Sequence, residues 1–352
     1  MDRKSLFFLL LIFSSCSSIY RFSVDIQEPA LVTLPVSAQN VLILNNTVAQ
    51  PINFGIERTI DGQSIRQDYP LSLDSMAWAA IEEISVVLNE SNFFKTISIY
   101  RQPIRTDNEW LSRVETISPE VQSDFYNTEN YDALLVIDRI LFSINENVKS
   151  IKTGYSSPEA TAFVDLRADG AITCSMYVPG REKPLTTFNV SDSLFTKSVV
   201  ENDSVALFTK IPEYILDELS RRIGNQMATS FIPTWKTSDR VLFTGYSSRM
   251  QEATGYAADR QWKKAESIWT AEIERVAKPG DKAKIAFNLA VINEMQDRVD
   301  SALAYAEKAG KYMESIDQNK NSQQIEITNQ YISELKQRIQ HNQLLDLQWG
   351  KE

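Results

Sequence analysis

The chain has 352 residues, enough for about two domains, and 46 Asp and Glu residues against 36 Lys and Arg give it a formal net charge of −10. An acidic chain without a basic cluster is a poor candidate for nucleic-acid binding, because phosphates must be neutralised by Lys and Arg. The single histidine, His341, lies near the end of the chain, so a Ser-His-Asp or Cys-His catalytic centre is not expected. We predict no catalytic residue, no metal site and no cofactor.

The beginning of the chain carries a targeting pattern. Two cations precede the apolar run Leu6 to Phe13, and two serines then lead to Cys16. This arrangement resembles the signal of bacterial lipoproteins, which is removed before a cysteine that is then acylated. The resemblance implies a signal peptide at residues 1–15, a lipid anchor on Cys16 and a tether at residues 16–35.

Two alternatives to this anchor are an ordinary signal peptide with an incidental Cys16 and an N-terminal membrane helix. The apolar run is far shorter than the roughly 20 residues that span a bilayer, which argues against the helix. No acidic residue follows Cys16 closely, since the first is Asp25. In lipoproteins of Bacteroidetes-type bacteria, surface export resembles a rule that places acids there, so we expect the periplasmic face of the outer membrane.

Residues 36–245 are predicted to form an α/β domain. The run Asn40 to Leu44 is apolar and bounded by polar residues, as in a buried strand, whereas residues 45–69 are polar and rich in turn formers. Apolar residues then recur at helical spacing from Leu73 to Leu88. The elements expected next are a strand at 94–100, helices at 109–114 and 119–126, and a buried strand at 131–144.

The second part of this domain is predicted to consist of hairpins. Asp169-Gly170 and Pro179-Gly180 are typical of hairpin turns. They separate three strand-length segments, at 161–166, 171–178 and 185–190. Cys174 falls on the apolar face of the second segment, which indicates a buried, inert thiol.

A helix is expected after Pro212, because apolar residues recur on one face from Ile215 to Met227. Strands that alternate with helices and then form hairpins predict a mixed sheet with helices packed on it. The pattern loosely resembles the small α/β domains of envelope lipoproteins that activate cell-wall synthases.

The C-terminal third contains an internal repeat. Residues 261–269 and 298–306 each place a bulky residue three positions before an alanine and a packing residue four positions after it. This pattern resembles the tetratricopeptide family, whose repeats have a period of about 34 residues. The resemblance implies a helical domain at residues 246–352, with a partner bound on its concave face; a generic bundle of helical hairpins is the alternative. The residues that match the packing positions of the repeat are Ala253, Tyr256, Ala265, Trp269, Leu289, Ala290, Ala302, Ala306 and Ala309.

The whole chain is therefore predicted to be an α+β protein, with an N-terminal mixed-sheet α/β domain followed by an all-α tetratricopeptide-like domain. This arrangement resembles a family of Bacteroidales outer-membrane lipoproteins with C-terminal tetratricopeptide-like repeats. We expect a non-enzymatic lipoprotein that binds an envelope protein through this module. An enzyme that uses carboxylates on envelope glycans and an activator of a cell-wall synthase stay open as alternatives. Arg240, between the domains, is interpreted as a buried ion-pair partner, with ligand binding as the alternative.

Overall fold

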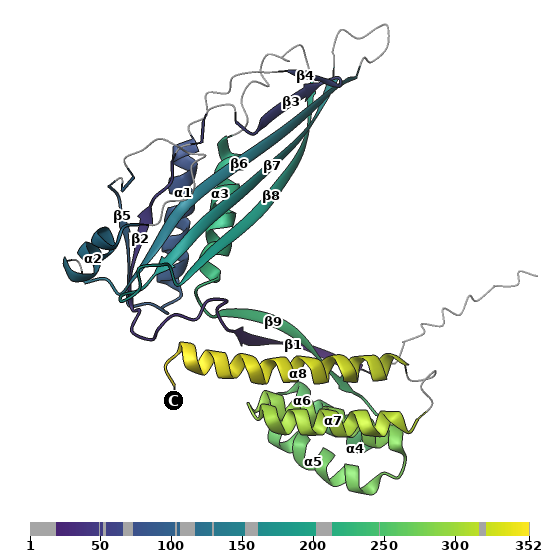
Figure 1. Ribbon diagram of the computed structural model, residues 1–352. Helices are drawn as coiled ribbons and strands as arrows, with labels where there is room; N and C mark the ends of the chain where they lie inside the picture. Colours follow the sequence, from purple (N-terminus) through teal and green to yellow (C-terminus); the bar gives the residue numbers. More distant parts are fainter. Residues whose placement is uncertain are drawn as a thin grey trace, which may run out of the picture. The chain divides into compact units, whose positions relative to one another are not determined.

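The computed structural model divides the chain into two compact units. The unit called here the sheet unit comprises Pro29–Thr234 and Leu345–Glu352, and the helical unit comprises Met1–Glu28 and Trp235–Leu344 (Figure 1). The structure describes residues 19–48, 50–51, 54–65, 73–102, 104–105, 117–128, 130–151, 161–201, 213–245, 247–316 and 322–351. The chain is thus mixed α/β, with a strand-rich N-terminal region followed by a helical one. The units divide at 234/235 rather than at the expected 245/246, because strand β9 belongs with the helices.

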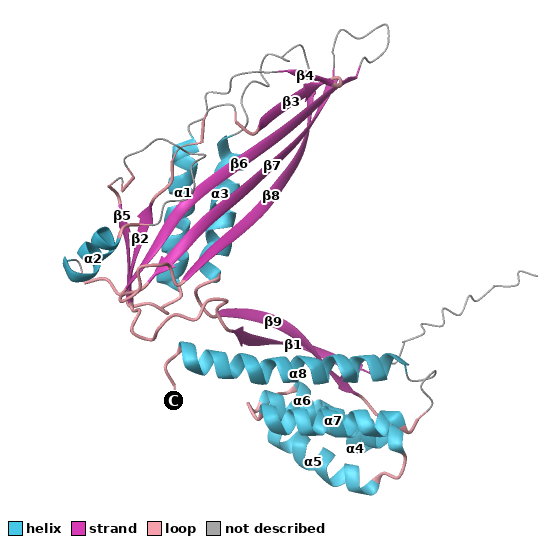
Figure 2. Ribbon diagram, in the orientation of Figure 1, coloured by secondary structure: helices cyan, strands magenta, loops and turns pink. Residues whose placement is uncertain are grey.

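The sheet unit is built on a seven-stranded mixed sheet among its described residues (Figure 2). Strand β2 (Asn40–Asn45) runs parallel to β5 (Thr96–Tyr100) on one side and to the central strand β6 (Ala133–Ile151) on the other. On β6 the sheet continues antiparallel through β7 (Thr161–Tyr177) and β8 (Thr186–Glu201). At the far end of β6 lies β3 (Ile56–Ile60), which is parallel to β6 and pairs with β4 (Gln63–Ile65).

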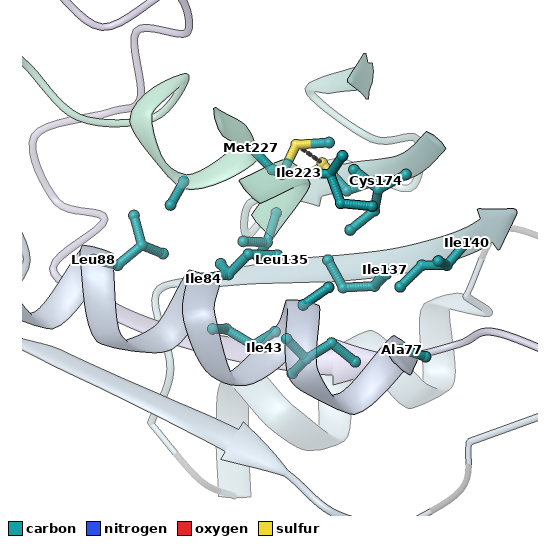
Figure 3. Packing of buried hydrophobic residues seen from close by; sticks show 14 of the residues in the cluster. Ile43, Ala77, Ile84, Leu88, Leu135, Ile137, Ile140, Cys174, Ile223 and Met227 are labelled. Carbon is teal, nitrogen blue, oxygen red and sulfur yellow. Dashed lines mark hydrogen bonds between the residues drawn. The ribbon is translucent and has the colours of Figure 1, made fainter. Parts of the chain in front are cut away.

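Helices cover both faces of the sheet around β2. On one face lie α1 (Leu73–Glu90) and α3 (Glu213–Thr229), whose apolar stripes join Val41 and Ile43 of β2 in the largest core of the unit (Figure 3). The expected helical stripe from Ile215 to Met227 is confirmed. The opposite face carries α2 (Pro119–Thr128), whose Phe125 packs with Leu42 and Leu44. The expected helix at 109–114 lies outside the described residues.

The predicted turn at Asp169-Gly170 is wrong, since β7 runs through it without a break. Gly170 is required there by packing. A Cβ atom at this position would lie 3.1 Å from Cγ of Leu219 on α3 and 3.4 Å from the ring of Phe142. The glycine thus marks a close approach of helix and strand, which sequence alone does not distinguish from a turn. The turn at Pro179-Gly180 is confirmed between β7 and β8, where Gly180 has a φ of +81°.

The segment 45–69, read from its polarity as turns alone, contains β3 and β4. Arg58 of β3 stands opposite Glu146 of β6 in the parallel register, and the two side chains form a buried ion pair of 3.0 Å. A buried charge is tolerated when it is paired, so polar residues occupy strand positions here. This pairing joins residues 88 apart in sequence and leaves no local periodic signal.

The helical unit contains five helices among its described residues, which confirms that the C-terminal region is helical. Their bounds are α4 (Ser248–Ala258), α5 (Trp262–Arg275), α6 (Pro279–Met295), α7 (Val299–Glu314) and α8 (Ser322–Gln348). Ser247 caps α4 by accepting a hydrogen bond from the backbone N–H of Met250. Pro279 occupies the first turn of α6, where its missing N–H costs nothing. None of the described helices is long and apolar enough to span a membrane.

A two-stranded ribbon of β1 (Ile19–Glu28) and β9 (Thr234–Phe243) completes the helical unit. Residues 19–28 were expected to be a tether, yet they form a strand, because the apolar residues Phe22, Val24 and Ile26 alternate with exposed polar ones and are partly buried. Side-chain hydrogen bonds join Ser23 to Asp239, Asp25 to Thr237 and Glu28 to Lys236. The residue numbers increase along β1 as those of their partners decrease along β9. The two strands are therefore antiparallel.

Candidate functional site

The residues predicted to pack the repeats lie in the core of the helical unit. Tyr256 is partly buried at its margin. The other eight are at most 1% exposed: Ala253, Ala265, Trp269, Leu289, Ala290, Ala302, Ala306 and Ala309. They hold the helices together and offer no surface to a ligand, so any binding site must be built from other residues.

Asn288 of helix α6 forms hydrogen bonds with the backbone at the end of β9. The side-chain oxygen of Asn288 accepts the N–H of Phe243 at 2.7 Å, and its amide nitrogen donates to the carbonyl of the same residue at 2.8 Å. The ring of Phe243 packs edge-on against Phe287 at 4.8 Å, and Phe287 in turn meets Tyr331 of α8 at 5.1 Å. The side of α6 that faces β9 is therefore already covered by an extended segment of the same chain.

A buried carboxylate, Glu294 of α6, forms a second set of contacts with β9, at Arg240. Arg240 forms two hydrogen bonds to it, Nε to Oε2 at 2.7 Å and Nη2 to Oε1 at 2.9 Å. Arg338 Nη1 donates to Oε1 at 2.6 Å, and the hydroxyl of Tyr331 donates to Oε2 at 2.7 Å. Arg240 also meets Glu334 at 3.0 Å. The interpretation of Arg240 as a buried ion-pair partner is confirmed.

Burial and the neighbouring charges shift the pKa values of Glu294, Arg240 and Tyr331. Burial by itself raises the pKa of Glu294, but the hydrogen bond and charge of Arg240, helped by Tyr331 and Arg338, hold it below its ordinary value. Burial lowers the pKa of Arg240, and Glu294 more than offsets this. Burial and the neighbouring carboxylate of Glu294 both raise the pKa of Tyr331. The cluster is thus an ionised network with a neutral phenol, and it anchors β9 between α6 and α8.

The outer edge of β1 borders a groove of about 450 Å³. Four consecutive residues of the strand, Phe22 to Asp25, line it. Successive side chains of a strand point to opposite faces, so a lining by consecutive residues means that the backbone edge faces the groove. Among the described strands, β1 pairs with β9 alone, and its other edge is left for this groove.

The lining of this groove contains aromatic rings and one side chain of each charge. Phe22 stacks on Tyr20 at 6.0 Å between ring centroids and lies 6.1 Å from Trp262, the first residue of α5. Arg260, at the turn between α4 and α5, lines the same groove and is exposed. The groove therefore combines a strand edge, apolar ring surface and one side chain of each charge, Arg260 and Asp25.

His341 borders a smaller cavity, of about 240 Å³, together with Arg240, Glu334 and Arg338. Its Nε2 lies 3.3 Å from the side-chain nitrogen of Gln337. Cys174 belongs to the sheet unit, where it is fully buried and lies 3.0 Å from the sulfur of Met227. Burial raises the pKa of the Cys174 thiol well above its ordinary value. The only histidine and the buried cysteine thus belong to different units and have different neighbours.

The predicted lipid anchor, Cys16, lies outside the described residues. The family described as a domain of unknown function, DUF8603, matches residues 38–243, more than half of the chain. The chain belongs to this family. A second domain of unknown function, DUF6340, matches residues 251–337, from α4 into α8.

A search of curated proteins found no match. Among solved structures, the chain is similar to a neuraminyllactose-binding hemagglutinin homolog from Helicobacter pylori, with 14% identity over 56% of this chain and 84% of that one and a TM-score of 0.21. It is similar to a DUF330 protein from Xanthomonas campestris, with 8% identity, coverage of 57% and 85%, and a TM-score of 0.21. A hypothetical protein from Chlamydia trachomatis gives 13% identity, coverage of 54% and 96%, and a TM-score of 0.21. TM-scores of this size do not establish a shared fold.

Sequence reasoning missed the groove along β1, although a signal for it was present. The alternation of Tyr20, Phe22, Val24 and Ile26 with polar residues is a strand pattern, and it was overlooked because prolines further along suggested a tether. The partner strand β9 and Trp262 lie more than 200 positions from β1, and Asn288 lies 45 positions from Phe243, so only the fold brings these residues together.

Proposed function

We propose that this protein is a lipid-anchored envelope protein whose helical unit binds an extended segment of another protein along the outer edge of β1. The observation that carries the proposal is the groove lined by four consecutive residues of β1. A strand edge offers unpaired N–H and C=O groups, and an incoming segment gains main-chain hydrogen bonds by adding to the sheet.

The walls of the groove suit such an occupant. Aromatic residues dominate the binding energy of many protein interfaces, and Tyr20, Phe22 and Trp262 meet here. Arg260 and Asp25 place one charge of each sign on the lining, so the groove sets no net charge for the bound segment. The partner therefore has an extended, partly apolar segment.

The helices support this role as a rigid platform. Their buried alanines and paired arrangement fit the proposal that they are tetratricopeptide-like repeats, a class whose function is to bind other proteins. The repeat surface on α6 is filled by β9 through Asn288 and Glu294. Binding is accordingly assigned to the edge of the ribbon, and no catalytic step is proposed.

Acylation of Cys16 would hold this module at the periplasmic face of the outer membrane, where its partner is an envelope protein. The targeting pattern before Cys16 supports the anchor. More than one acyl chain on one residue gives stable rather than reversible attachment. The location is thus proposed from the sequence pattern, and the binding mode from the geometry of the groove.

Site-specific photo-crosslinking in living cells tests the binding mode. A benzophenone amino acid at Tyr20, inside the groove, is compared with the same amino acid at Trp235, which is 71% exposed on β9 and does not line the groove. We expect a discrete protein adduct from position 20 only, and its loss when Trp262 is changed to Ala. Trp235→Ala serves as the matched control and should leave the adduct intact. Equal adducts from both positions, or none from position 20 at normal abundance, would refute the proposal.

A further inference from the structure

A second cavity lies in the sheet unit, independent of the ribbon groove, at the carboxyl ends of two parallel strands. Asn45 ends β2, and Arg101 directly follows the end of β5. These positions are adjacent in the register, because Leu44 is paired with Tyr100. A cavity of about 320 Å³ opens there, lined by both residues together with Thr47, Trp78, Gln102 and Arg105.

The topology makes this edge a natural ligand site. After β2 the chain passes through β3, β4 and then α1 to reach β5 on one side of β2, and it leaves β5 through α2 to reach β6 on the other side. With α1 and α2 on opposite faces of the sheet, the connections diverge at β2. In open α/β sheets, ligands bind outside the carboxyl ends of the strands at such a switch point. Helix α1 also begins at this edge, so its positive end faces the same side.

The lining determines the charge of the ligand. Two guanidinium groups, Arg101 and Arg105, border the cavity, and none of its described lining residues is acidic, although the chain as a whole carries a charge of −10. Glu82 reaches Arg101 at 3.3 Å, but the side chains of Arg101 and Glu82 are 67% and 46% exposed, and such a surface pair is weak. Asp138, a buried acid of the same unit, accepts hydrogen bonds from Ser175 at 2.6 Å and Asn46 at 3.4 Å, and its charge also interacts with that of Arg105.

The remaining groups add polar and planar contacts. Thr47 donates both its N–H and its hydroxyl to the side-chain oxygen of Asn45, at 3.1 and 2.8 Å, which holds the turn after β2 and leaves the amide nitrogen of Asn45 as a donor. The guanidinium of Arg101 lies 5.8 Å from the ring centre of Trp78. Stacking of this kind orients a guanidinium for paired hydrogen bonds to a tetrahedral anion.

We propose that this cavity binds a phosphate monoester. Arg101 and Arg105 hold the phosphate, the amide of Asn45 donates to it, and the organic part of the ester lies against Trp78. Two sources share this chemistry, a small soluble phosphate ester and a phospholipid headgroup with a terminal phosphate. The apolar neighbours Ala77 and Ile104 also line the cavity, so either source fits the lining.

Calorimetric titration of the full-length protein in detergent with glycerol 3-phosphate tests the site. We expect saturable binding that weakens about ten- to hundredfold in the Arg101→Gln/Arg105→Gln variant, because charge-assisted hydrogen bonds are lost. The control is Arg181→Gln/Lys183→Gln, which removes the same charge from exposed positions of the same unit and should bind like the unaltered protein. Thermal unfolding of each variant verifies that the sheet unit is folded.

Short-chain phosphatidic acid, titrated in the same detergent, separates the two sources. Tighter binding than glycerol 3-phosphate assigns a lipid headgroup, and weaker or equal binding assigns a soluble ester. Absence of saturation with both probes, or equal losses in the paired arginine variant and its control, would overturn the proposal. Neither result bears on the crosslinking at Tyr20, since that groove belongs to the helical unit.

Discussion

The charge cluster around Glu294 gives a sharp prediction about what holds β9 on the helices. Glu294 is fully buried at its side chain and accepts hydrogen bonds from Arg240, Arg338 and Tyr331. In Glu294→Gln the carboxylate is replaced by an amide of the same shape. Two guanidinium groups, 3% and 17% exposed, then lose their buried counter-charge and keep only the more exposed carboxylates of Glu334, at 3.0 Å from Arg240, and Asp297, at 3.6 Å from Arg338.

The magnitude follows from this burial. Breaking a buried ion pair by removing one partner costs about 3–5 kcal/mol, since an uncompensated charge stays behind. A matched control is Glu307→Gln, which breaks the pair with Lys336 at 3.2 Å, where both side chains are about half exposed. Such a surface pair contributes about 1 kcal/mol or less. The two substitutions are chemically identical, so only burial separates them.

Replacing the whole cluster with apolar residues should restore most of the stability that Glu294→Gln removes. In the variant Arg240→Met/Glu294→Leu/Tyr331→Phe/Arg338→Met, no buried charge or hydroxyl is left unpaired, and Glu334 is free to turn to solvent. Exchange of a buried ionic cluster for apolar residues is often neutral or stabilising by about 1–4 kcal/mol. We therefore expect this variant to unfold close to the unaltered protein.

Hydrogen exchange of the α6 and β9 amides, followed by mass spectrometry at increasing urea, measures the opening free energy of the helical unit by itself. The same measurement carries a pH test. The pKa of Glu294 is held below its ordinary value, so its contribution is present above an unfolded pKa of about 4.3 and is lost as pH falls through the folded pKa. The difference in opening free energy between Glu294→Gln and the unaltered protein should therefore decrease as pH falls through the folded pKa of Glu294. If Glu294→Gln costs no more than Glu307→Gln at neutral pH, the reasoning about the buried cluster is wrong.

The other predictions concern packing, anchoring and the buried thiol. Ala302→Phe should destabilise the helical unit by about 1–3 kcal/mol through overpacking, as measured by the same exchange experiment, and an unchanged value would contradict the burial of this alanine. Gly170→Val should destabilise the sheet unit by a similar amount, visible as a lower midpoint in thermal unfolding, because its Cβ would crowd Leu219 at 3.1 Å. Cys16→Ser should release the protein from the membrane fraction; a variant that stays membrane-bound in high salt without lipid would contradict the anchor. Cys174 should react with thiol reagents only after unfolding, and rapid labelling of the native protein would show that its strand face is open.

The sequence determined the elements whose signal is local. The helical spacing from Leu73 to Leu88 and from Ile215 to Met227 predicts α1 and α3, because each helix buries one face against the sheet. The apolar run at Asn40 predicts β2, and Pro179-Gly180 predicts the turn between β7 and β8. In the same way, the spacing of alanines and aromatics predicts the helical C-terminal region.

The tertiary structure decided whatever depends on partners distant in sequence. Glycine is common in turns, but Gly170 lies within β7, where the absence of a Cβ atom leaves room for Leu219. Arg58 is a polar residue in a polar segment, and only the register with Glu146 makes β3. Residues 19–28 become a strand because β9 pairs with them more than 200 residues later. Local periodicity carries no information about such pairs, so neither the ribbon groove nor the arginine-lined cavity is visible before the chain is folded.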